Sequence, residues 1–585
     1  MKRCPQCNRV ETDEALKFCR IDGATLVSEP SSIDQEAGTV KLGSHPLLNE
    51  TETNILRDRT GANINCPTAP TTVLPAEPAS AATGDLSKPK RRKVLIVLAV
   101  FVAVVIVAAI VGTYVYSTRH NRTAIESIAV LPFVNQSGNS DTEYFSDGVT
   151  ESVINTLSQL PQLKVMARST MFRFKGREAD PLSVGKELGV QAVLTGRVLQ
   201  RGDSLVIDAE LVKIADGTQI WGEQYNRKAS DVLDVQQSIA NEISNNLRLK
   251  LTGESEKRLA KRYTDNAEAY RLYLQGRYEF FKFTPEGISK AIEYYNRAIA
   301  LDPNYALAYT GLANAYVLQG NSEILPQQEA HSKARSAAEK AVALDDALSE
   351  AHDAIATVKL FDEWDWPAGE RELKRALELN PNNSGAHVTY GNYFKAMGRV
   401  DDEMAEVKRG LELDPLSSFY NFELAEALLF SRRYDEAIAQ SQKTIQLDPH
   451  FSLTYYALGD AYEQKGMLRD AVAAFQKGRE ISGPAGEAMS LASLASAYWK
   501  SGEHAEALKT IDELQRISKQ RYVPPYWTAF AYASIGDKDQ AFAWLDKAYE
   551  DRFFLLMWIK PDPRFDLIRS DPRYQQLLRR MNLES

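Results

Sequence analysis

Four residues near the N-terminus have the types and the spacing that metal binding requires. Two residues separate Cys4 from Cys7, and two residues likewise separate Cys19 from Asp22. Structural zinc takes four ligands in a tetrahedron, and two short turns that each offer a pair supply them with little backbone to order. The set Cys4, Cys7, Cys19 and Asp22 therefore predicts a structural zinc site in residues 1–27, a segment that the metal would fold.

The same segment resembles short bacterial zinc-ribbon heads of the form CPxC…FCxxDGxxL, in which Phe18, Asp22, Gly23 and Leu26 have counterparts. It departs from a four-cysteine ribbon at Asp22, and a carboxylate is a less favourable zinc ligand than a thiolate. A metal-free redox cluster or a merely structural one is the alternative interpretation.

An apolar run follows farther along the chain. Residues 94–116 are 23 consecutive positions without a charge, and a helix of that length rises roughly 35 Å, enough to cross a bilayer. All four cysteines precede residue 67, which suits a reducing cytoplasm on that side. By the positive-inside rule, five cations before the run and two after it place the N-terminus in the cytoplasm: Lys88, Lys90, Arg91, Arg92 and Lys93 against Arg119 and Arg122.

We therefore predict a single-pass protein of the inner (cytoplasmic) membrane whose C-terminal domains are periplasmic or otherwise extracytoplasmic. Residues 28–93 are rich in Ser, Thr, Ala, Pro and Glu and lack apolar periodicity, which predicts a disordered linker ending in a basic run. The net charge of −9 argues against nucleic acid as a main partner.

After the membrane, short apolar runs alternate with helical stretches. This pattern predicts an α/β domain over residues 124–250, with a hairpin around Arg201-Gly202-Asp203. The expected strands are 127–133, 163–167, 192–200 and 205–213, and the expected helices are 144–157 and 231–249.

The motifs AVLPF, EYFSDGVTESVINTLSQL, RSTMFRFKG and GTQIWGEQYNR, with the pattern GxxLxVxxVLTGxV over 185–198, resemble the TolB amino-terminal-like family of bacterial membrane proteins. Its members resemble envelope proteins of the FlgO and CsgG type. The resemblance implies a domain for partner binding or assembly.

Asp147, Glu151 and Arg168 are candidates for acid–base chemistry in this domain. An Asp-Gly step before an apolar-periodic run is also a common way to begin a helix, with the carboxylate near the positive end of the dipole. We favour the capping interpretation.

From residue 267 the chain is helical and self-similar. Small residues stand at the matched positions Gly391, Ala425 and Gly459, where paired helices touch. We predict about eight tetratricopeptide repeats over 267–550 and a polar cap, so that an all-α solenoid fills 267–585. A Leu-Asp-Pro or Leu-Asn-Pro phrase ends successive second helices at the tetratricopeptide period of 34 residues: 379–381, 413–415 and 447–449.

Stacked helix pairs curve, so the first helices of the repeats line a concave groove. We predict that this groove holds an extended peptide or a partner helix, with aromatic anchors and with carboxylates that favour a basic ligand. The alternative is that many of these side chains pack against neighbouring repeats. The repeat pattern places ten residues on or near the groove: Phe419, Phe422, Glu426, Leu429, Leu453, Tyr456, Asp460, Glu463, Trp499 and Phe530.

The sequence contains no P-loop, GxSxG, HExxH or dinucleotide motif, and its seven histidines are scattered. We predict a multidomain chain with a small zinc-ribbon-like head, one transmembrane helix, a TolB-like α/β domain and an all-α tetratricopeptide solenoid. Its expected function is that of a non-enzymatic, membrane-anchored scaffold for proteins or peptides, with self-association left open. The alternatives are a transmembrane signalling receptor whose ribbon is the cytoplasmic output, and a hydrolase whose site these motifs do not reveal.

Overall fold

The computed structural model describes residues 125–583, with gaps at 139–141, 178, 229–230, 248, 250–251, 322–324 and 326, and three dipeptides near the N-terminus. The chain divides into two compact units, 1–94 and 95–585. In the first unit, the two-residue strands β1 (Lys2–Arg3), β2 (Val10–Glu11) and β3 (Val27–Ser28) form an antiparallel sheet in the order β2-β1-β3.

The predicted zinc ligands Cys4, Cys7, Cys19 and Asp22 lie outside the described residues, as do the predicted linker 28–93, apart from Ser28, and the predicted membrane segment 94–116. Over the part of the chain that the structure does describe, none of the helices is long and apolar enough to cross a membrane. The membrane topology and the zinc site therefore stay predictions.

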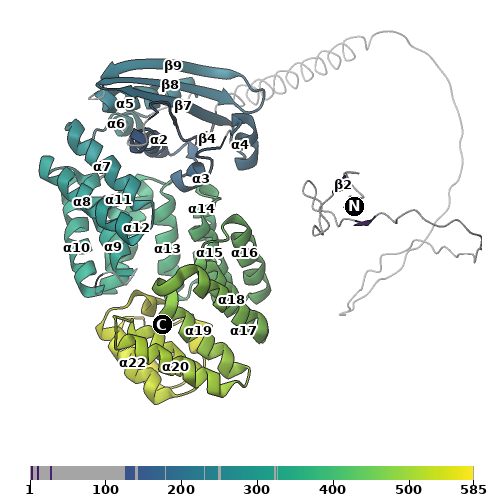
Figure 1. The fold of residues 1–585 in the computed structure, drawn as a ribbon. Helices are drawn as coiled ribbons and strands as arrows, with labels where there is room; N and C mark the ends of the chain where they lie inside the picture. Colours follow the sequence, from purple (N-terminus) through teal and green to yellow (C-terminus); the bar gives the residue numbers. More distant parts are fainter. Residues whose placement is uncertain are drawn as a thin grey trace, which may run out of the picture. The chain divides into compact units, whose positions relative to one another are not determined.

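The second unit begins with a mixed α/β domain (Figure 1). Its sheet has the order β6-β4-β7-β8-β9, with β5 paired to β7. The strands β4, β5, β6 and β7 pair in parallel, whereas β7, β8 and β9 are antiparallel. The strands are β4 (Ser127–Val130), β5 (Val134–Asn135), β6 (Lys164–Val165), β7 (Ala192–Arg201), β8 (Ser204–Lys213) and β9 (Gln219–Lys228).

The predicted hairpin joins β7 to β8, where Arg201 faces Ser204 across a two-residue turn. Gly202 in that turn has φ +56°, a left-handed conformation that favours glycine. The third long strand, β9, was not predicted. The helices of this domain are α2 (Glu143–Ser158), α3 (Arg168–Phe172), α4 (Pro181–Leu188), α5 (Val232–Asn246) and α6 (Gly253–Leu259).

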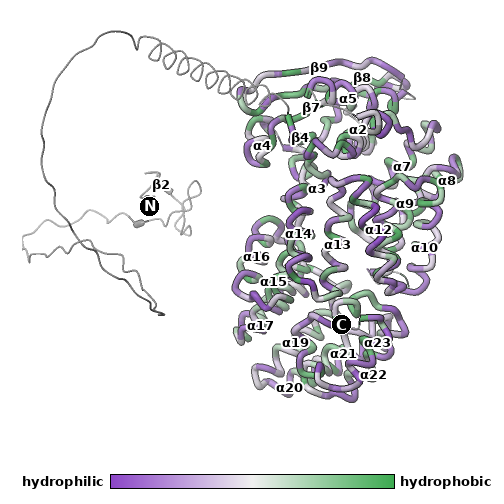
Figure 2. Tube along the Cα trace, turned by 180° about the vertical axis from the view of Figure 1, so that it is seen from behind, coloured by the Kyte–Doolittle hydropathy of each residue, from purple (hydrophilic) through white to green (hydrophobic). Residues whose placement is uncertain are grey.

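The helical array follows as eight consecutive helix pairs within the described residues (Figure 1). Hydrophobic and hydrophilic positions are interspersed along its helices (Figure 2). The pairs are α7 (Ala267–Phe280) with α8 (Pro285–Leu301), α9 (Ala306–Asn321) with α10 (Gln327–Leu344), α11 (Ser349–Val358) with α12 (Trp366–Leu379), α13 (Ser384–Met397) with α14 (Val400–Leu413), α15 (Ser418–Phe430) with α16 (Tyr434–Leu447), α17 (Ser452–Gln464) with α18 (Leu468–Ser482), α19 (Glu487–Lys500) with α20 (His504–Ser518), and α21 (Pro525–Ser534) with α22 (Lys538–Glu550).

Short helical segments interrupt and close the array. The π-helix η3 (Lys359–Glu363) separates α11 from α12, and the 3₁₀ segment η4 (Gly483–Gly486) precedes α19. After α22 the chain forms η5 (Phe554–Trp558), η6 (Pro563–Phe565) and α23 (Pro572–Arg580). The sequence predicted a capping helix here but did not predict where it packs.

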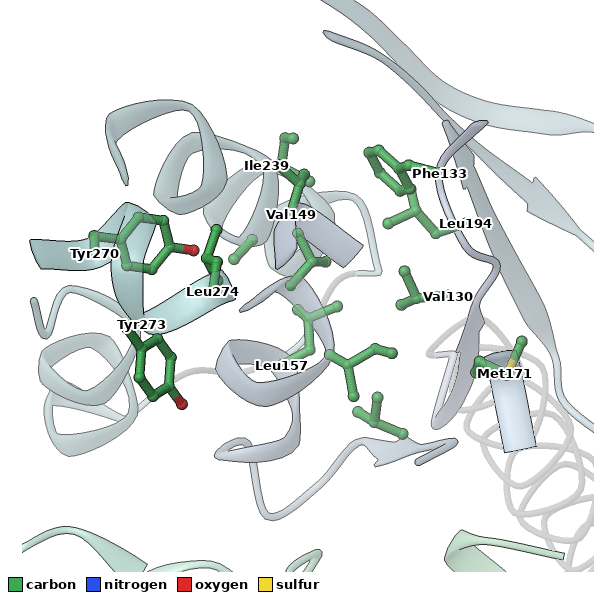
Figure 3. Packing of buried hydrophobic residues seen from close by; sticks show 14 of the residues in the cluster. Val130, Phe133, Val149, Leu157, Met171, Leu194, Ile239, Tyr270, Tyr273 and Leu274 are labelled. Atoms are coloured by element: carbon green, nitrogen blue, oxygen red, sulfur yellow. The ribbon is translucent and has the colours of Figure 1, made fainter. Parts of the chain in front are cut away.

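The hydrophobic core is continuous from the sheet into the first repeats. Figure 3 shows Val149 and Leu157 of α2 packed between the sheet and the side chains of α7. The contact is tight at Gly148, where a Cβ atom would come within 2.4 Å of the Leu274 side chain. The α/β domain and the array therefore share buried surface.

Candidate protein-binding surface

The first helices of the repeats carry the predicted groove residues, and the C-terminal segment 551–583 packs against α13, α17 and α21 among them. Trp558 donates its indole N–H to the Asn392 carbonyl at 3.1 Å, and Trp366 donates its indole N–H to the Met581 carbonyl at 2.8 Å. The Phe554 ring stacks on Phe361 with centroids 6.2 Å apart. These contacts tie residues 551–583 to η3, α12 and α13, far back in the sequence.

The carboxylates predicted for the groove are engaged within the chain. Asp460 Oδ2 lies 3.0 Å from Arg564 Nη1 of the C-terminal segment. Glu463 Oε1 accepts from Lys500 Nζ at 2.7 Å and from Ser496 Oγ at 2.8 Å. The prediction that these acids face a basic ligand is therefore corrected, because cations of the chain itself already hold them.

Several apolar side chains predicted for the groove are buried. Phe530 is 1% exposed, with its ring centroid 5.9 Å from that of Phe565. Leu429 is 1% exposed, and Tyr456 packs on Phe475 at 6.4 Å. For these residues the structure supports the alternative of packing against neighbouring repeats and the cap.

Of the remaining predicted residues, Phe419 and Leu453 lie nearer the surface, whereas Phe422 is 7% exposed. Phe419 is 42% exposed, and its ring lies 6.2 Å from that of Phe422. Phe422 in turn meets Phe451 at 6.0 Å, and Leu453 is half-buried. We call Phe419, Phe422 and Phe451 the aromatic surface. Trp499 lies apart from it and packs on His504 at 4.1 Å.

Glu426 belongs to a buried charge cluster around Lys395, which is 1% exposed. The Lys395 ammonium lies 3.0 Å from Glu423, 3.1 Å from Glu426 and 3.9 Å from Glu403. Trp558 closes the cluster, with its ring 4.6 Å from the ammonium nitrogen. Burial favours the neutral amine, but the carboxylates outweigh it and raise the pKa of Lys395.

One ammonium cannot neutralise three carboxylates. Glu403 is the most distant of them, and its Oε1 has no hydrogen-bond partner. Burial raises the pKa of Glu403 to about 8. Burial likewise raises the pKa of Asp460 to about 7, although Arg564 opposes it. The sequence pattern did not reveal Lys395, Glu403 or Arg564, because their partners are distant along the chain.

The α/β domain docks on the ends of the second helices of three successive repeats. Arg258 donates to the Leu379 carbonyl, and Arg173 donates to the Leu447 carbonyl. Between them, the Leu413 carbonyl accepts from the Ala167 N–H at 2.8 Å. These carbonyls are 34 residues apart and stand in the predicted marker phrases. Helix C-termini leave carbonyls unsatisfied and carry a partial negative charge, which suits arginine donors.

Two polar side chains in or directly after these phrases reinforce the docking. Asn382 donates its amide to the carbonyls of Ser158 at 3.0 Å, Leu160 at 3.2 Å and Leu163 at 3.0 Å. Asp414 accepts from Thr170 Oγ1 at 2.6 Å and is 1% exposed. The α/β domain and repeats three to five are therefore held in a fixed arrangement.

The acid–base candidates of the α/β domain take part in ion pairs. Glu151 lies between Arg168, at 3.0 Å, and Arg277 of α7. Asp147 is paired with Lys175 at 2.6 Å. Helix α2 begins at Glu143, so Asp147 is not at its start, and the capping interpretation is wrong for this residue. The cluster joins α2, α3 and α7 and is buried at their junction.

A cavity of about 570 Å³ lies elsewhere, on the sheet face that carries Arg197, Asp208 and Glu210. Its charges have both signs, and we assign it no chemistry. Where side chains are described, no group of three or more His, Cys, Asp or Glu residues is placed to hold a metal ion.

Comparison with known proteins supports the reading of the array. Residues 288–320 match a family model described as TPR repeat, and residues 422–487 match one described as tetratricopeptide repeat. The C-terminal region is a tetratricopeptide array. Residues 124–242 match the HilA/YgeH-like transcriptional regulator, second domain. The resemblance to the TolB amino-terminal-like family stays a prediction.

Two curated relatives share parts of this sequence. Putative adenylate cyclase 3 of Rhizobium meliloti (strain 1021) is 37% identical over 187 residues, 32% of each chain. Transcriptional regulator HilA of Salmonella typhimurium is 22% identical over 280 residues, 48% of this chain and 49% of the regulator. The matches thus span between a third and a half of the relatives' length.

Among solved structures, two match parts of this chain. The MamA protein is 24% identical, with a TM-score of 0.25, over 29% of this chain and 92% of that one. PilW, a type IV pilus biogenesis factor, is 18% identical, with a TM-score of 0.31, over 36% of this chain and 92% of that one.

Proposed function

We propose that the chain is a non-enzymatic scaffold that binds protein partners through its tetratricopeptide array and α/β domain. The observation that carries the proposal is the array itself, because stacked helix pairs build extended surfaces suited to peptides and helices. The docking of the α/β domain on three successive repeats supports a binding surface of fixed geometry.

Anchoring in the inner membrane through residues 94–116, with an exported C-terminal part, belongs to the same proposal. So does a structural zinc ion held by Cys4, Cys7, Cys19 and Asp22 in the cytoplasm. Both rest on the sequence: on the charge-free run with its flanking cations and on the cysteine spacing.

Within the array, we place the partner contact at the aromatic surface. Residues 551–583 pack against α13, α17 and α21, whereas Phe419 is exposed beside the rings of Phe422 and Phe451. Exposed aromatic side chains next to a packed apolar floor are common anchors at protein interfaces. The expected ligand is an extended protein segment with an apolar anchor.

The test is capture of partners from cell envelopes by the full-length chain with an N-terminal affinity tag, followed by mass spectrometry. Phe419→Ala should lower recovery of a stoichiometric partner at least fivefold. Met467→Ala is the matched control, because Met467 is 39% exposed but directly precedes α18, at the other end of α17 from Phe451. Equal recovery with both variants would remove the aromatic surface from the proposal, and the absence of any stoichiometric protein would contradict the scaffold.

A transmembrane signalling receptor is the second candidate. The relatives are named a transcriptional regulator and a putative adenylate cyclase, yet each shares only part of its length with this chain. Such sharing supports a common binding module attached to different outputs, with the ribbon as the output here. If the chain is a receptor, deleting residues 1–27 should abolish its signalling but leave partner capture intact. If it is only a scaffold, the deletion should change neither.

A further inference from the structure

The outer edge of β9 is open. Strand β9 spans ten residues at the end of the sheet and, among the described strands, pairs only with β8 (Figure 1). Helix α5 packs on one face of β9, but among the described residues no other backbone reaches its outer edge. A long open edge exposes unpaired N–H and C=O groups that can pair with another strand.

The edge carries two charges that lack opposite charges. Glu223 and Arg227 are exposed, and their neighbours on β8 are the apolar residues Ala209 and Leu205. Arg227 Nη1 donates to the Asn226 carbonyl at 2.9 Å. Neither side chain makes an ion pair in the described part of the chain. A charge on an incoming strand could complement each of them.

Strand geometry restricts how two copies of β9 can pair. In an edge strand, the backbone N–H and C=O groups point outward at every second residue. When two identical strands pair antiparallel, the residue numbers of two facing residues therefore differ by an even number. Centring on Glu223 sets two glutamates opposite each other, and centring on Gln224 forms no charge pair. Centring on Tyr225 sets each Glu223 opposite Arg227 of the partner subunit.

We propose that β9 pairs antiparallel with β9 of a second copy of this chain, in the register centred on Tyr225. The pairing joins two sheets into one and forms two symmetric Glu223–Arg227 ion pairs. Opposite charges that face each other across strands stabilise the pairing, and like charges destabilise it. The association is isologous and closes as a dimer. It does not depend on what the repeat array binds.

The test is a charge exchange in the full-length chain, purified in detergent and followed by sedimentation velocity over a range of concentrations. Glu223→Arg and Arg227→Glu each set like charges opposite one another, so each should weaken dimerisation about tenfold or more. The double variant restores both opposite pairs and should recover wild-type affinity. Glu210→Arg is the control, because Glu210 is exposed on β8 but is not on the edge.

An equimolar mixture of the two single variants gives a second, independent measurement. Each variant should be a weak dimer alone, whereas the mixture should form heterodimers with complementary pairs. This recovery would also show that both variants are folded. A wild-type chain that stays monomeric, or a dimer whose affinity neither single reversal changes, would overturn the proposal.

Discussion

Lys395 and its three carboxylates form a charge cluster with more acid than base in a buried site. Two of the acids hold the ammonium at hydrogen-bond distance, and Glu403 stands off at 3.9 Å without a donor for its Oε1. Because desolvation penalises the unpaired charge, Glu403 keeps a proton that an exposed glutamate would lose. The cluster therefore couples the fold to pH.

Replacing Glu403 by glutamine should remove part of this pH dependence. The folded pKa of about 8 exceeds the unfolded value near 4.5, so the folded state holds the proton more tightly and the unfolding free energy falls as pH rises between those values. Glu403→Gln should match the wild type at pH 4.5 and be about 2–4 kcal/mol more stable at pH 9. Urea titrations from pH 4.5 to 9 measure the unfolding free energy of both proteins. The same pH dependence of this free energy in the variant and the wild type would contradict the prediction. Glu412→Gln, on the exposed side of α14, is the control.

Removing the cation of the same cluster should have the opposite effect. Lys395→Ala leaves the buried Glu423 and the half-buried Glu426 without their donor, which costs about 3–5 kcal/mol of unfolding free energy at neutral pH. Lys408→Ala removes an exposed lysine from α14 and should change stability by less than about 0.5 kcal/mol. Equal losses in denaturant unfolding would show that the cluster contributes nothing specific.

At the scale of helices, the matched small residues of the repeats are not equally constrained. A Cβ at Gly459 would lie 2.3 Å from the Phe475 ring, whereas one at Gly391 would lie 2.9 Å from a Val407 methyl. The third member of the set, Ala425, is an alanine that is fully buried. The approach of the paired helices therefore differs from one repeat to the next.

This difference predicts unequal costs for the same substitution. Gly459→Ala should lower the unfolding free energy by about 1–3 kcal/mol, because a buried ring must move. Gly391→Ala should cost less, since a valine methyl yields by a small shift and alanine favours the helix by up to about 1 kcal/mol. Denaturant midpoints of the two variants decide the order, and a larger loss at Gly391 would contradict the packing argument.

At the scale of the molecule, the α/β domain caps the ends of α12, α14 and α16 and shares a core with α7. The two parts should therefore unfold together. Arg173→Ala combined with Asn382→Ala removes donors to the Leu447 carbonyl and to three carbonyls of the α/β domain. Calorimetry should resolve two transitions for this variant and one for the wild type. A single transition in both would show that the apolar core alone couples them.

The 34-residue phrases and the matched small residues determined the array from the sequence, because each repeat packs mainly against its neighbours and its pattern is local. The hairpin between β7 and β8 was predicted for the same reason. The candidate site was not predictable in this way. The repeat pattern assigns groove positions to Glu426, Asp460 and Phe530. In the structure these residues face other residues of the chain: Lys395, Arg564 and Phe565, respectively.

Only the tertiary structure decided that residues 551–583 return to the middle repeats, and that the Leu379, Leu413 and Leu447 carbonyls meet the α/β domain. Both contacts join residues more than a hundred positions apart, and such pairs leave no periodic signal in one sequence. The physical reason is curvature. Small rotations accumulate over stacked repeats until distant segments meet, and which side chains then face one another depends on the sum of those rotations.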